Sequence, residues 1–231
     1  PLTLVPVDIE GMVEKNALLM KGLVQDALEF IYKTHQSYSQ ECCDVCYVAF
    51  SGGKDSLAVL DLVQRALSKD DFFVVFGDTG MEIESTYESV KRAQARWDDL
   101  RFYTAHSRHS PDETWEKFGP PSRIQRWCCS VHKSAPSLLL LRELKGDSSV
   151  TALAFDGVRA EESEKRSRYS RVMAGAKHSI QVNASPLLTW NSAELFLYLF
   201  ERDLLLNDAY RYGMVRVGCA VCPMSSRWWD F

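Results

Sequence analysis

The chain has 231 residues, 46% of them hydrophobic and 25% charged, which is the balance of a globular protein and excludes a disordered chain. Its 27 Lys and Arg stand against 31 Asp and Glu, and the net charge of −4 excludes a protein that coats nucleic acid through general basicity. No apolar stretch approaches the roughly 20 residues of a membrane span and no secretory signal is visible, so we expect a cytoplasmic protein without membrane contact.

Hydrophobic periodicity predicts the elements in chain order. Apolar residues recur at intervals of three and four residues within the segment 9–35, which predicts one or two amphipathic helices. The strongly charged segment 159–177 is predicted to be a mobile surface loop. Between these segments and beyond them we expect strands at 47–50, 72–76, 101–103 and 150–155, and helices at 57–67, 84–97, 134–144 and 191–200, the last capped by Asn191 or Ser192.

The predicted strands are uniformly apolar and alternate with helices, a pattern typical of a parallel sheet covered on both faces. We therefore predict an α/β fold, a doubly wound and mostly parallel sheet with helices on both faces and an N-terminal helical appendage. The expected organisation is a helical segment at 1–40 packed on the core, a nucleotide-binding α/β domain at 41–206, and a C-terminal segment at 207–231 that carries the second cysteine pair.

A glycine-rich motif, Ser-Gly-Gly-Lys-Asp-Ser at residues 51–56, lies between the first predicted strand and a buried helix. Its two glycines let backbone N–H groups approach an anion, and the helix N-terminus adds partial positive charge. Lys54 supplies a full positive charge, and the two serines supply hydroxyl donors. The motif is not a Walker A loop, because that pattern requires glycine where Val48 stands. It predicts a shorter phosphate-binding loop.

This motif resembles the PP-loop of the adenine nucleotide α-hydrolase-like superfamily, which includes ATP pyrophosphatases and the phosphoadenosine phosphosulfate (PAPS) reductase family. Within residues 46–223 two further segments are similar to that family. Residues 78–87 resemble its D-T-G-x-x-x-x-E/S-T-Y segment, and residues 157–166 resemble its G-x-R-x-x-E/Q-S-x-x-R segment. Both follow predicted strands, and the carboxyl ends of strands are where open α/β sheets bind ligands.

The resemblance implies a set of residues for binding an adenine nucleotide. Two guanidinium groups on one loop can clamp a phosphate or sulfate, so the three expected catalytic cations are Lys54, Arg159 and Arg166. Lys133 is expected to point toward the bound anion. The full set expected at the nucleotide is Ser51, Gly52, Gly53, Lys54, Asp55, Ser56, Asp78, Thr79, Lys133 and Arg159.

Seven cysteines fall in three groups, and an odd number in a chain without a visible signal peptide favours metal ligands or redox thiols over disulfides. Four thiolates suit an iron–sulfur cube, and zinc binds the same ligands, although adjacent cysteines are unusual in zinc ribbons. The first group, Cys42, Cys43 and Cys46, is interpreted as packing or incidental thiols.

The other two groups resemble the iron–sulfur branch of the PAPS reductase family, which shows C-C-x-x-R-K-x-x-P and a later G-C-x-x-C. In this chain His132 stands where that pattern has arginine. The resemblance implies a [4Fe–4S] cluster held by Cys128, Cys129, Cys219 and Cys222.

The choice of reaction depends on two further features. The sulfonucleotide reductases of the family use a nucleophilic cysteine beyond G-C-x-x-C, and the printed sequence has none after Cys222. Many reductases also carry an altered phosphate loop, whereas this one keeps the full motif. We therefore expect an ATP pyrophosphatase that uses ATP with Mg²⁺ to activate an acceptor for sulfur incorporation, similar to the DndC-type enzymes of DNA phosphorothioation.

Two alternatives stay open: an adenylyl-sulfate or PAPS reductase that produces sulfite, and a non-catalytic nucleotide-binding subunit of a modification complex. The expected partners are an adenine nucleotide and a sulfur donor protein, either a cysteine desulfurase or a thioredoxin-like protein. Nucleic acid is expected only through a local patch or a partner subunit, and the sequence predicts no oligomeric state.

Overall fold

A six-stranded sheet with the order β3-β2-β1-β4-β6-β5 forms the centre of the computed structural model, which describes residues 7–174 and 180–224. All neighbouring strands pair in parallel except β5 and β6, which are antiparallel. The chain runs outward in both directions from the centre, so the switch point lies between β1 and β4. The strands are β1 Val45–Phe50, β2 Phe73–Asp78, β3 Phe102–His106, β4 Ala152–Phe155, β5 Val172–Ala174 and β6 Gln181–Ala184.

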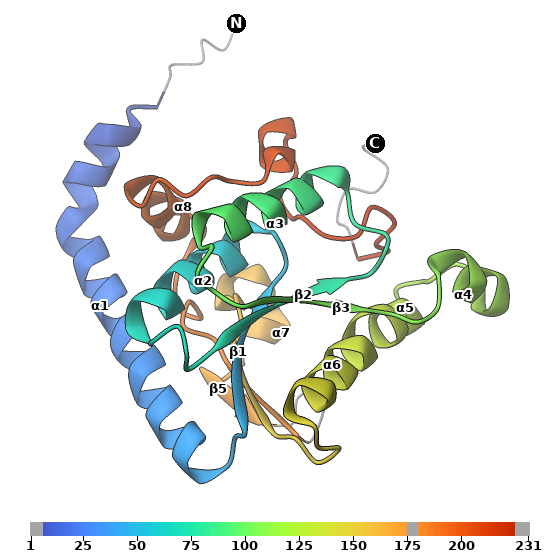
Figure 1. Cartoon of the computed structure of the whole chain (residues 1–231). Coiled ribbons are helices and arrows are strands. Elements are labelled where there is room, and N and C mark those ends of the chain that lie inside the picture. The colour runs from blue at the N-terminus through green and yellow to red at the C-terminus, as the bar shows by residue number, and fades with distance from the viewer. Residues whose placement is uncertain (1–6, 175–179, 225–231) are drawn as a thin grey trace, which may run out of the picture.

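Helices connect the strands, and the predicted mostly parallel α/β fold is confirmed (Figure 1). The N-terminal periodicity corresponds to a single long helix, and Asn191 caps the last helix by accepting a hydrogen bond from the Glu194 N–H. The α-helices are α1 Ile9–Glu41, α2 Lys54–Ala66, α3 Glu84–Arg96, α4 Pro111–Phe118, α5 Trp127–Cys129, α6 Ala135–Lys145, α7 Glu164–Ser167 and α8 Ser192–Glu201. A π-helix, η1, spans Ser130–Ser134, and the 3₁₀ helices η2 and η3 span Ala160–Glu162 and Asp208–Tyr212.

The prediction of a loop over 159–177 is wrong for the described part of that segment. It contains η2, α7 and β5, and Ser163 caps α7 by accepting a hydrogen bond from the Arg166 N–H. The three residues of β5 pair with β6 at the sheet edge. The many charged residues of this segment led to the prediction of a solvated loop. In the structure several of these charged groups pair with one another.

The two faces of the sheet are covered unequally. Helices α1, α2, α3 and α8 bury apolar residues on one face, including Met20 and Ile31 of α1. The other face has a smaller core in which Leu141 of α6 packs with Tyr47 and Phe73. Figure 1 shows α6 on the opposite side of the sheet from α1. The thinner cover on the α6 face leaves room for a pocket.

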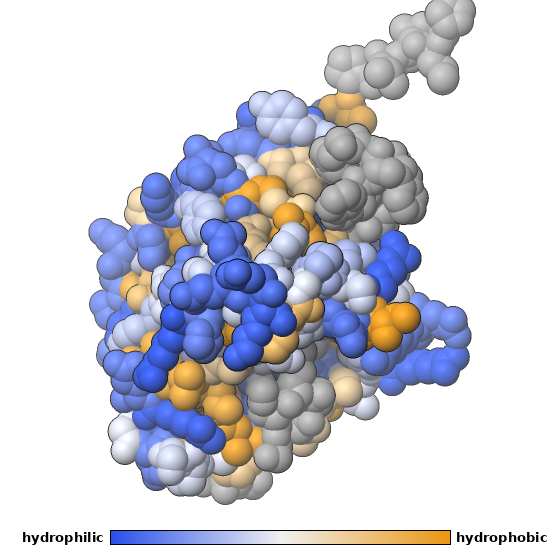
Figure 2. Space-filling model, turned by 90° about the vertical axis from the view of Figure 1, so that its right-hand side faces the viewer, coloured by the Kyte–Doolittle hydropathy of each residue, from blue (hydrophilic) through white to orange (hydrophobic). Residues whose placement is uncertain are grey.

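The outer surface over α4 to α6 is mostly hydrophilic, with separate apolar patches (Figure 2). Among the helices of the described residues, none has the length and apolar character that crossing a bilayer requires.

Candidate functional site

The loop between β1 and α2 closes tightly around its own polar groups. Gly52 has φ +70°, a conformation that a side chain rarely adopts, and a Cβ there would lie 3.1 Å from the methyl group of Thr86. The Ser56 hydroxyl donates to the Gly53 carbonyl at 3.0 Å and accepts from the Ser51 N–H at 3.1 Å. The predicted phosphate loop is therefore a preformed turn that ends on a helix N-terminus.

The first turn of α2 leaves N–H groups available. Gly53 is the N-cap and provides no side-chain cap, and the Lys54 N–H donates to the hydroxyl of Tyr210 at 3.0 Å. Within the described residues, the N–H groups of Asp55 and Ser56 have no hydrogen-bond acceptor. Unpaired N–H groups at a helix N-terminus suit an anion, because the helix dipole adds to their partial charges.

A pocket of about 480 Å³ opens beside this loop, at the carboxyl ends of β1, β2 and β4. It continues along the α6 face of the sheet as far as Tyr47 and β6. Three cationic side chains, from η1, α7 and the C-terminal segment, line it together with two thiols. The polar lining residues include Ser51, Asp55, Ser56, Lys133, Asp156, Glu162, Arg166, Gln181, Asn183, Tyr210, Arg216, Cys219 and Cys222.

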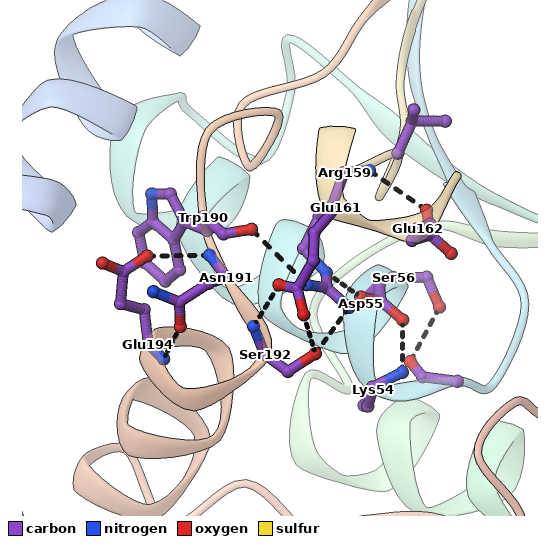
Figure 3. A network of polar contacts seen from close by, with 12 residues as sticks. Lys54, Asp55, Ser56, Arg159, Glu161, Glu162, Trp190, Asn191, Ser192 and Glu194 are labelled. Carbon is purple, nitrogen blue, oxygen red and sulfur yellow. Dashed lines mark hydrogen bonds and ion pairs between the residues drawn. The ribbon is translucent and has the colours of Figure 1, made fainter. Parts of the chain in front are cut away.

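Two of the predicted catalytic cations, Lys54 and Arg159, are buried against Asp55 (Figure 3). Lys54 Nζ lies 3.0 Å from one Asp55 oxygen, and Arg159 Nε lies 2.7 Å from the other. Arg159 also contacts Glu161 at 3.1 Å and donates to the Trp190 carbonyl at 3.4 Å. Neither cation is among the described residues that line the pocket. In this structure they fix the position of Asp55.

Arg166, the third predicted cation, lines the pocket and pairs with Glu162. The other oxygen of Glu162 pairs with Arg216, a residue that the sequence analysis did not identify. Burial alone would raise the pKa of Glu162, but the hydrogen bonds from Arg216 and from the Arg159 N–H, with the charge of Arg166, hold it below its ordinary value. Two guanidinium groups thus share one carboxylate at the pocket, where the anion of a ligand could replace it.

Asp78 and Thr79 lie at the carboxyl end of β2, as predicted, but they are not among the described residues that line the pocket. Asp78 Oδ1 accepts from the Gly80 N–H at 2.8 Å and from the Tyr87 hydroxyl at 3.0 Å. Thr79 is buried, donates to Glu82 at 3.0 Å and lies 3.3 Å from Cys219 Sγ. These two residues shape the turn that receives the C-terminal segment.

Contacts between distant segments bring the second and third cysteine groups to the same end of the sheet. The Ala220 N–H donates to the Met81 carbonyl at 2.8 Å, and Arg123 Nε donates to the Pro223 carbonyl at 3.1 Å. Burial raises the pKa of Cys128 to about 11, with further contributions from Cys129 and Cys222. Cys219 and Cys222 line the pocket, together with Lys133.

The donor chemistry fits a sulfur-ligated group, but the thiols do not form a closed site for a single ion. Tetrahedral zinc with bonds of about 2.3 Å would need sulfurs about 3.8 Å apart. Across the residues that the structure describes, no group of three or more His, Cys, Asp or Glu side chains could hold one metal ion. A four-iron cluster is larger and takes four cysteine ligands, so its thiols stand further apart than those of zinc.

His132, which stands where the family pattern has arginine, is a buried packing residue at the centre of η1. Its Nε2 lies 2.8 Å from the Thr114 hydroxyl, which itself donates to carbonyls of α4 and its cap. Burial lowers the pKa of His132, and its ring contacts Trp127. The side chain therefore joins the cysteine-bearing segment to α4 and does not face the pocket.

The first cysteine group lies at the opposite end of the strands, where the central strand β1 begins. Cys46 is buried in the core, as its interpretation as a packing residue requires, whereas Cys42 is exposed, with its sulfur 4.0 Å from that of Cys43. Cys42 and Cys43 precede the six-residue strand β1, whose length places them roughly 20 Å from Ser51. Cys46 lies within β1, but its side chain packs in the core on the α1 face, opposite to the face along which the pocket runs. They cannot reach a ligand in the pocket without a large rearrangement.

Several pocket residues were missed by the sequence analysis. Tyr210 and Arg216 reach the pocket from a C-terminal segment whose placement depends on long-range contacts. Gln181 and Asn183 lie on β6, where polar residues at i and i+2 alternate with apolar ones. That alternation is a strand signal, and it could have indicated a strand with one polar face.

Comparisons with known proteins show the family and the fold of the chain. The Phosphoadenosine phosphosulfate reductase domain family matches residues 45–225. An uncharacterized protein from Methanocaldococcus jannaschii is 33% identical over 92% of the chain, and the chain spans only 42% of that relative's length. Adenosine 5'-phosphosulfate reductase from Geobacillus kaustophilus is 26% identical over 90% of the chain and 84% of its own length.

The crystal structure of phosphoadenylyl-sulfate reductase from Candida auris has the same fold, with a TM-score of 0.60 at 17% identity over 94% of this chain and 97% of that chain. The fold is that of the PP-loop, adenine nucleotide α-hydrolase-like proteins. Because the family match covers most of the sequence, the chain belongs to the phosphoadenosine phosphosulfate reductase domain family.

Proposed function

We propose that the chain is an ATP pyrophosphatase that adenylates an acceptor oxygen and so prepares it for replacement by sulfur. The observation that carries this proposal is the open first turn of α2 in the same pocket as three cations. Backbone N–H groups and cations converging on one cavity suit the polyphosphate of a nucleotide better than a single carboxylate.

In the proposed reaction the acceptor oxygen attacks the α-phosphorus of ATP. An oxygen–phosphorus bond forms, and the bond from the α-phosphorus to the bridging oxygen of pyrophosphate breaks, so the electron pair leaves with pyrophosphate. Mg²⁺, when bound to the phosphates, neutralises part of this charge. Catalysis of this kind relies on positioning and charge stabilisation more than on a general base.

Different groups of the chain would bind the pyrophosphate and balance its charge. The N–H groups of Asp55 and Ser56 and the serine hydroxyls would hold pyrophosphate, and Lys133, Arg166 and Arg216 would balance its charge. Lys54 and Arg159 would act through Asp55, which they clamp from both sides.

The test of this loop is Lys54→Ala, with pyrophosphate release from ATP as the readout. We expect release to stop, because Asp55 and the first turn of α2 lose their buried partner. Lys91→Ala, at an exposed position of α3, is the matched control and should leave release unchanged. Full turnover by a folded Lys54→Ala protein would remove the loop from the mechanism.

We also propose that Cys128, Cys129, Cys219 and Cys222 hold a [4Fe–4S] cluster. The convergence of their segments on the pocket supports this proposal. When bound, the cluster would supply iron sites for electron or sulfur transfer next to the nucleotide. Anaerobic purification should yield about four iron and four sulfide per chain. Cys222→Ser should lose them and Cys42→Ser should keep them, and stoichiometric zinc in the wild-type protein would contradict the proposal.

Adenylyl-sulfate reduction is the second candidate, and one specific observation favours it. The relatives named adenosine 5'-phosphosulfate reductase align with most of this chain and most of their own length. Sulfite formation from adenylyl sulfate with reduced thioredoxin would reverse our ranking. ATP binding without turnover, in the presence of a candidate sulfur donor and nucleic-acid acceptor, would instead favour a non-catalytic subunit.

A further inference from the structure

The C-terminal segment provides the acceptor for the first N–H group of α2. Gly53, the N-cap of this helix, has no side chain to offer, and the Lys54 N–H donates to Tyr210 Oη at 3.0 Å. Tyr210 belongs to η3 and stands 156 residues further along the chain. Its phenol therefore takes the place of the side-chain cap that α2 lacks.

The second glycine of the phosphate loop leaves room for this phenol. Gly53 has φ −94°, which any residue can adopt, so the backbone conformation does not require glycine there. A Cβ on Gly53 would lie 3.2 Å from Tyr210 Oη, a crowded contact that the ring could relieve only by moving away. Gly52 serves the turn of the loop, and Gly53 serves the close approach of Tyr210.

Contacts within the protein hold η3 over the loop, so the phenol is in place before a ligand arrives. Asn207 Nδ2 donates to the Gly52 carbonyl at 3.3 Å, just before η3 begins. Asp208, the first residue of η3, pairs with Arg92 of α3 at 3.2 Å. Because these contacts already order the segment, binding a ligand through the phenol costs little further conformational entropy.

The proton of the Tyr210 hydroxyl is left for the pocket, which Tyr210 lines. A phenol oxygen both accepts and donates, and the Lys54 N–H uses it as an acceptor. Among the residues that the structure describes, the hydroxyl has no hydrogen-bond acceptor for its own proton. Burial, with the charges of Asp55 and Glu162, raises the pKa of Tyr210 against the opposite effect of the Lys54 N–H, so the hydroxyl stays protonated.

We infer that Tyr210 is a further phosphate-binding residue, whose O–H donates to the anion held by the N–H groups of Asp55 and Ser56. This inference rests on the proposed function, because pyrophosphate must occupy the phosphate loop. The first N–H of α2 is taken up by the phenol oxygen, and the phenol passes that hydrogen bond on to the ligand. A hydroxyl whose oxygen accepts a hydrogen bond donates more strongly, so Tyr210 extends the helix N-terminus into the pocket.

Tyr210 differs from the cations of the pocket because it carries no charge. Arg166 and Arg216 attract a phosphate over a distance, and salt screens this attraction. The phenol acts only through a hydrogen bond at contact. Its contribution to the affinity for pyrophosphate should therefore depend little on the salt concentration, in contrast to the contributions of the two arginines.

The first experiment is Tyr210→Phe in the full chain, with pyrophosphate as the probe and calorimetry at low and at high salt. We expect binding to weaken about tenfold at both salt concentrations, the effect of one hydrogen bond to a charged group. The loss in Arg166→Gln should shrink at high salt. Tyr212→Phe, at an 84% exposed side chain of the same short helix, is the matched control and should bind as the wild type does.

A second substitution separates a donor to the ligand from a mere cap of α2. Incorporating 3-fluorotyrosine at position 210 makes the phenol more acidic, so it accepts more weakly from the Lys54 N–H and donates more strongly to an anion. We expect pyrophosphate to bind more tightly to this protein than to the wild type. Unchanged or weaker binding would reduce Tyr210 to a cap and overturn the inference.

The outcomes also separate the inference from the proposed function. If the wild-type protein binds pyrophosphate and Tyr210→Phe binds it equally well, the inference fails and the proposed function stands. A lower urea midpoint for Tyr210→Phe with unchanged affinity has the same meaning. Failure of the wild-type protein to bind pyrophosphate overturns both.

Discussion

Two networks of charged side chains lie next to each other along residues 157–171. They differ in how far their arginine side chains are buried and in which groups those side chains contact. Arg159 is 4% exposed in its side chain, and its guanidinium contacts Asp55, Glu161 and a backbone carbonyl. Arg166 is 33% exposed and contacts Glu162, which it shares with Arg216. The first network is closed by protein groups, whereas the second faces the pocket and is open to exchange.

The difference teaches that two arginines in one motif need not do the same work. A buried charge that loses its partner is costly, because neither water nor another group replaces it. A partly exposed ion pair contributes little to stability, so an incoming anion can replace the carboxylate at a small cost in free energy. The closed network therefore belongs to the architecture of the loop, and the open one is the network to which we assign ligand binding in the proposed function.

The largest expected effect follows from breaking the closed network. Arg159→Leu leaves Asp55 and Glu161 without their shared partner, and we expect the free energy of unfolding to fall by about 3 kcal/mol. Urea denaturation measures this change. The control is Arg168→Leu, whose pair with Glu164 is exposed on both sides, and it should cost less than about 1 kcal/mol. Equal losses in the two variants would contradict the division between the networks.

The open network should show the opposite behaviour, with an effect on binding and not on stability. Replacing Arg166 or Arg216 with glutamine removes a charged hydrogen-bond donor from the pocket, and we expect pyrophosphate to bind about tenfold more weakly. Calorimetry at two salt concentrations measures the affinity. Arg211→Gln, at a side chain that is 80% exposed, is the control and should bind as the wild type does. A loss of stability with unchanged affinity would assign Arg166 and Arg216 to the architecture instead.

The sequence predicted the sheet well where its signal was local. Strand β1 is a continuous apolar run, as are the first four residues of β2, and β1 leads directly into the loop whose glycines the motif identified. It failed at β5 and β6, because one is three residues long in a charged segment and the other alternates polar and apolar residues. An edge hairpin of this kind depends on the pairing with β4, which no local pattern shows.

The sequence likewise predicted only those parts of the candidate site that a local motif marks. The motif located the loop, but it gave no means of separating Arg159 from Arg166, because burial decides between them and burial is set by α8 and its cap. Arg216 was missed because its partner, Glu162, is 54 residues away along the chain. Residues that act through distant partners carry no short-range signature in the sequence.

The smallest expected effect concerns the carboxylate that the two pocket arginines share. The pKa of Glu162 lies below its ordinary value of 4.5 in the folded protein, so its charge stabilises the fold above that pH and this contribution is lost as the pH falls. Glu162→Gln should therefore unfold slightly more easily at neutral pH, by less than about 1 kcal/mol because the pairs are partly exposed. The difference from the wild type should close on acidification, as urea denaturation across pH 3 to 7 (roughly the span of this titration) would measure. The same substitution removes the carboxylate that competes for Arg166 and Arg216, so pyrophosphate should bind more tightly to the variant, and weaker binding would mean that Glu162 orients the arginines for the ligand.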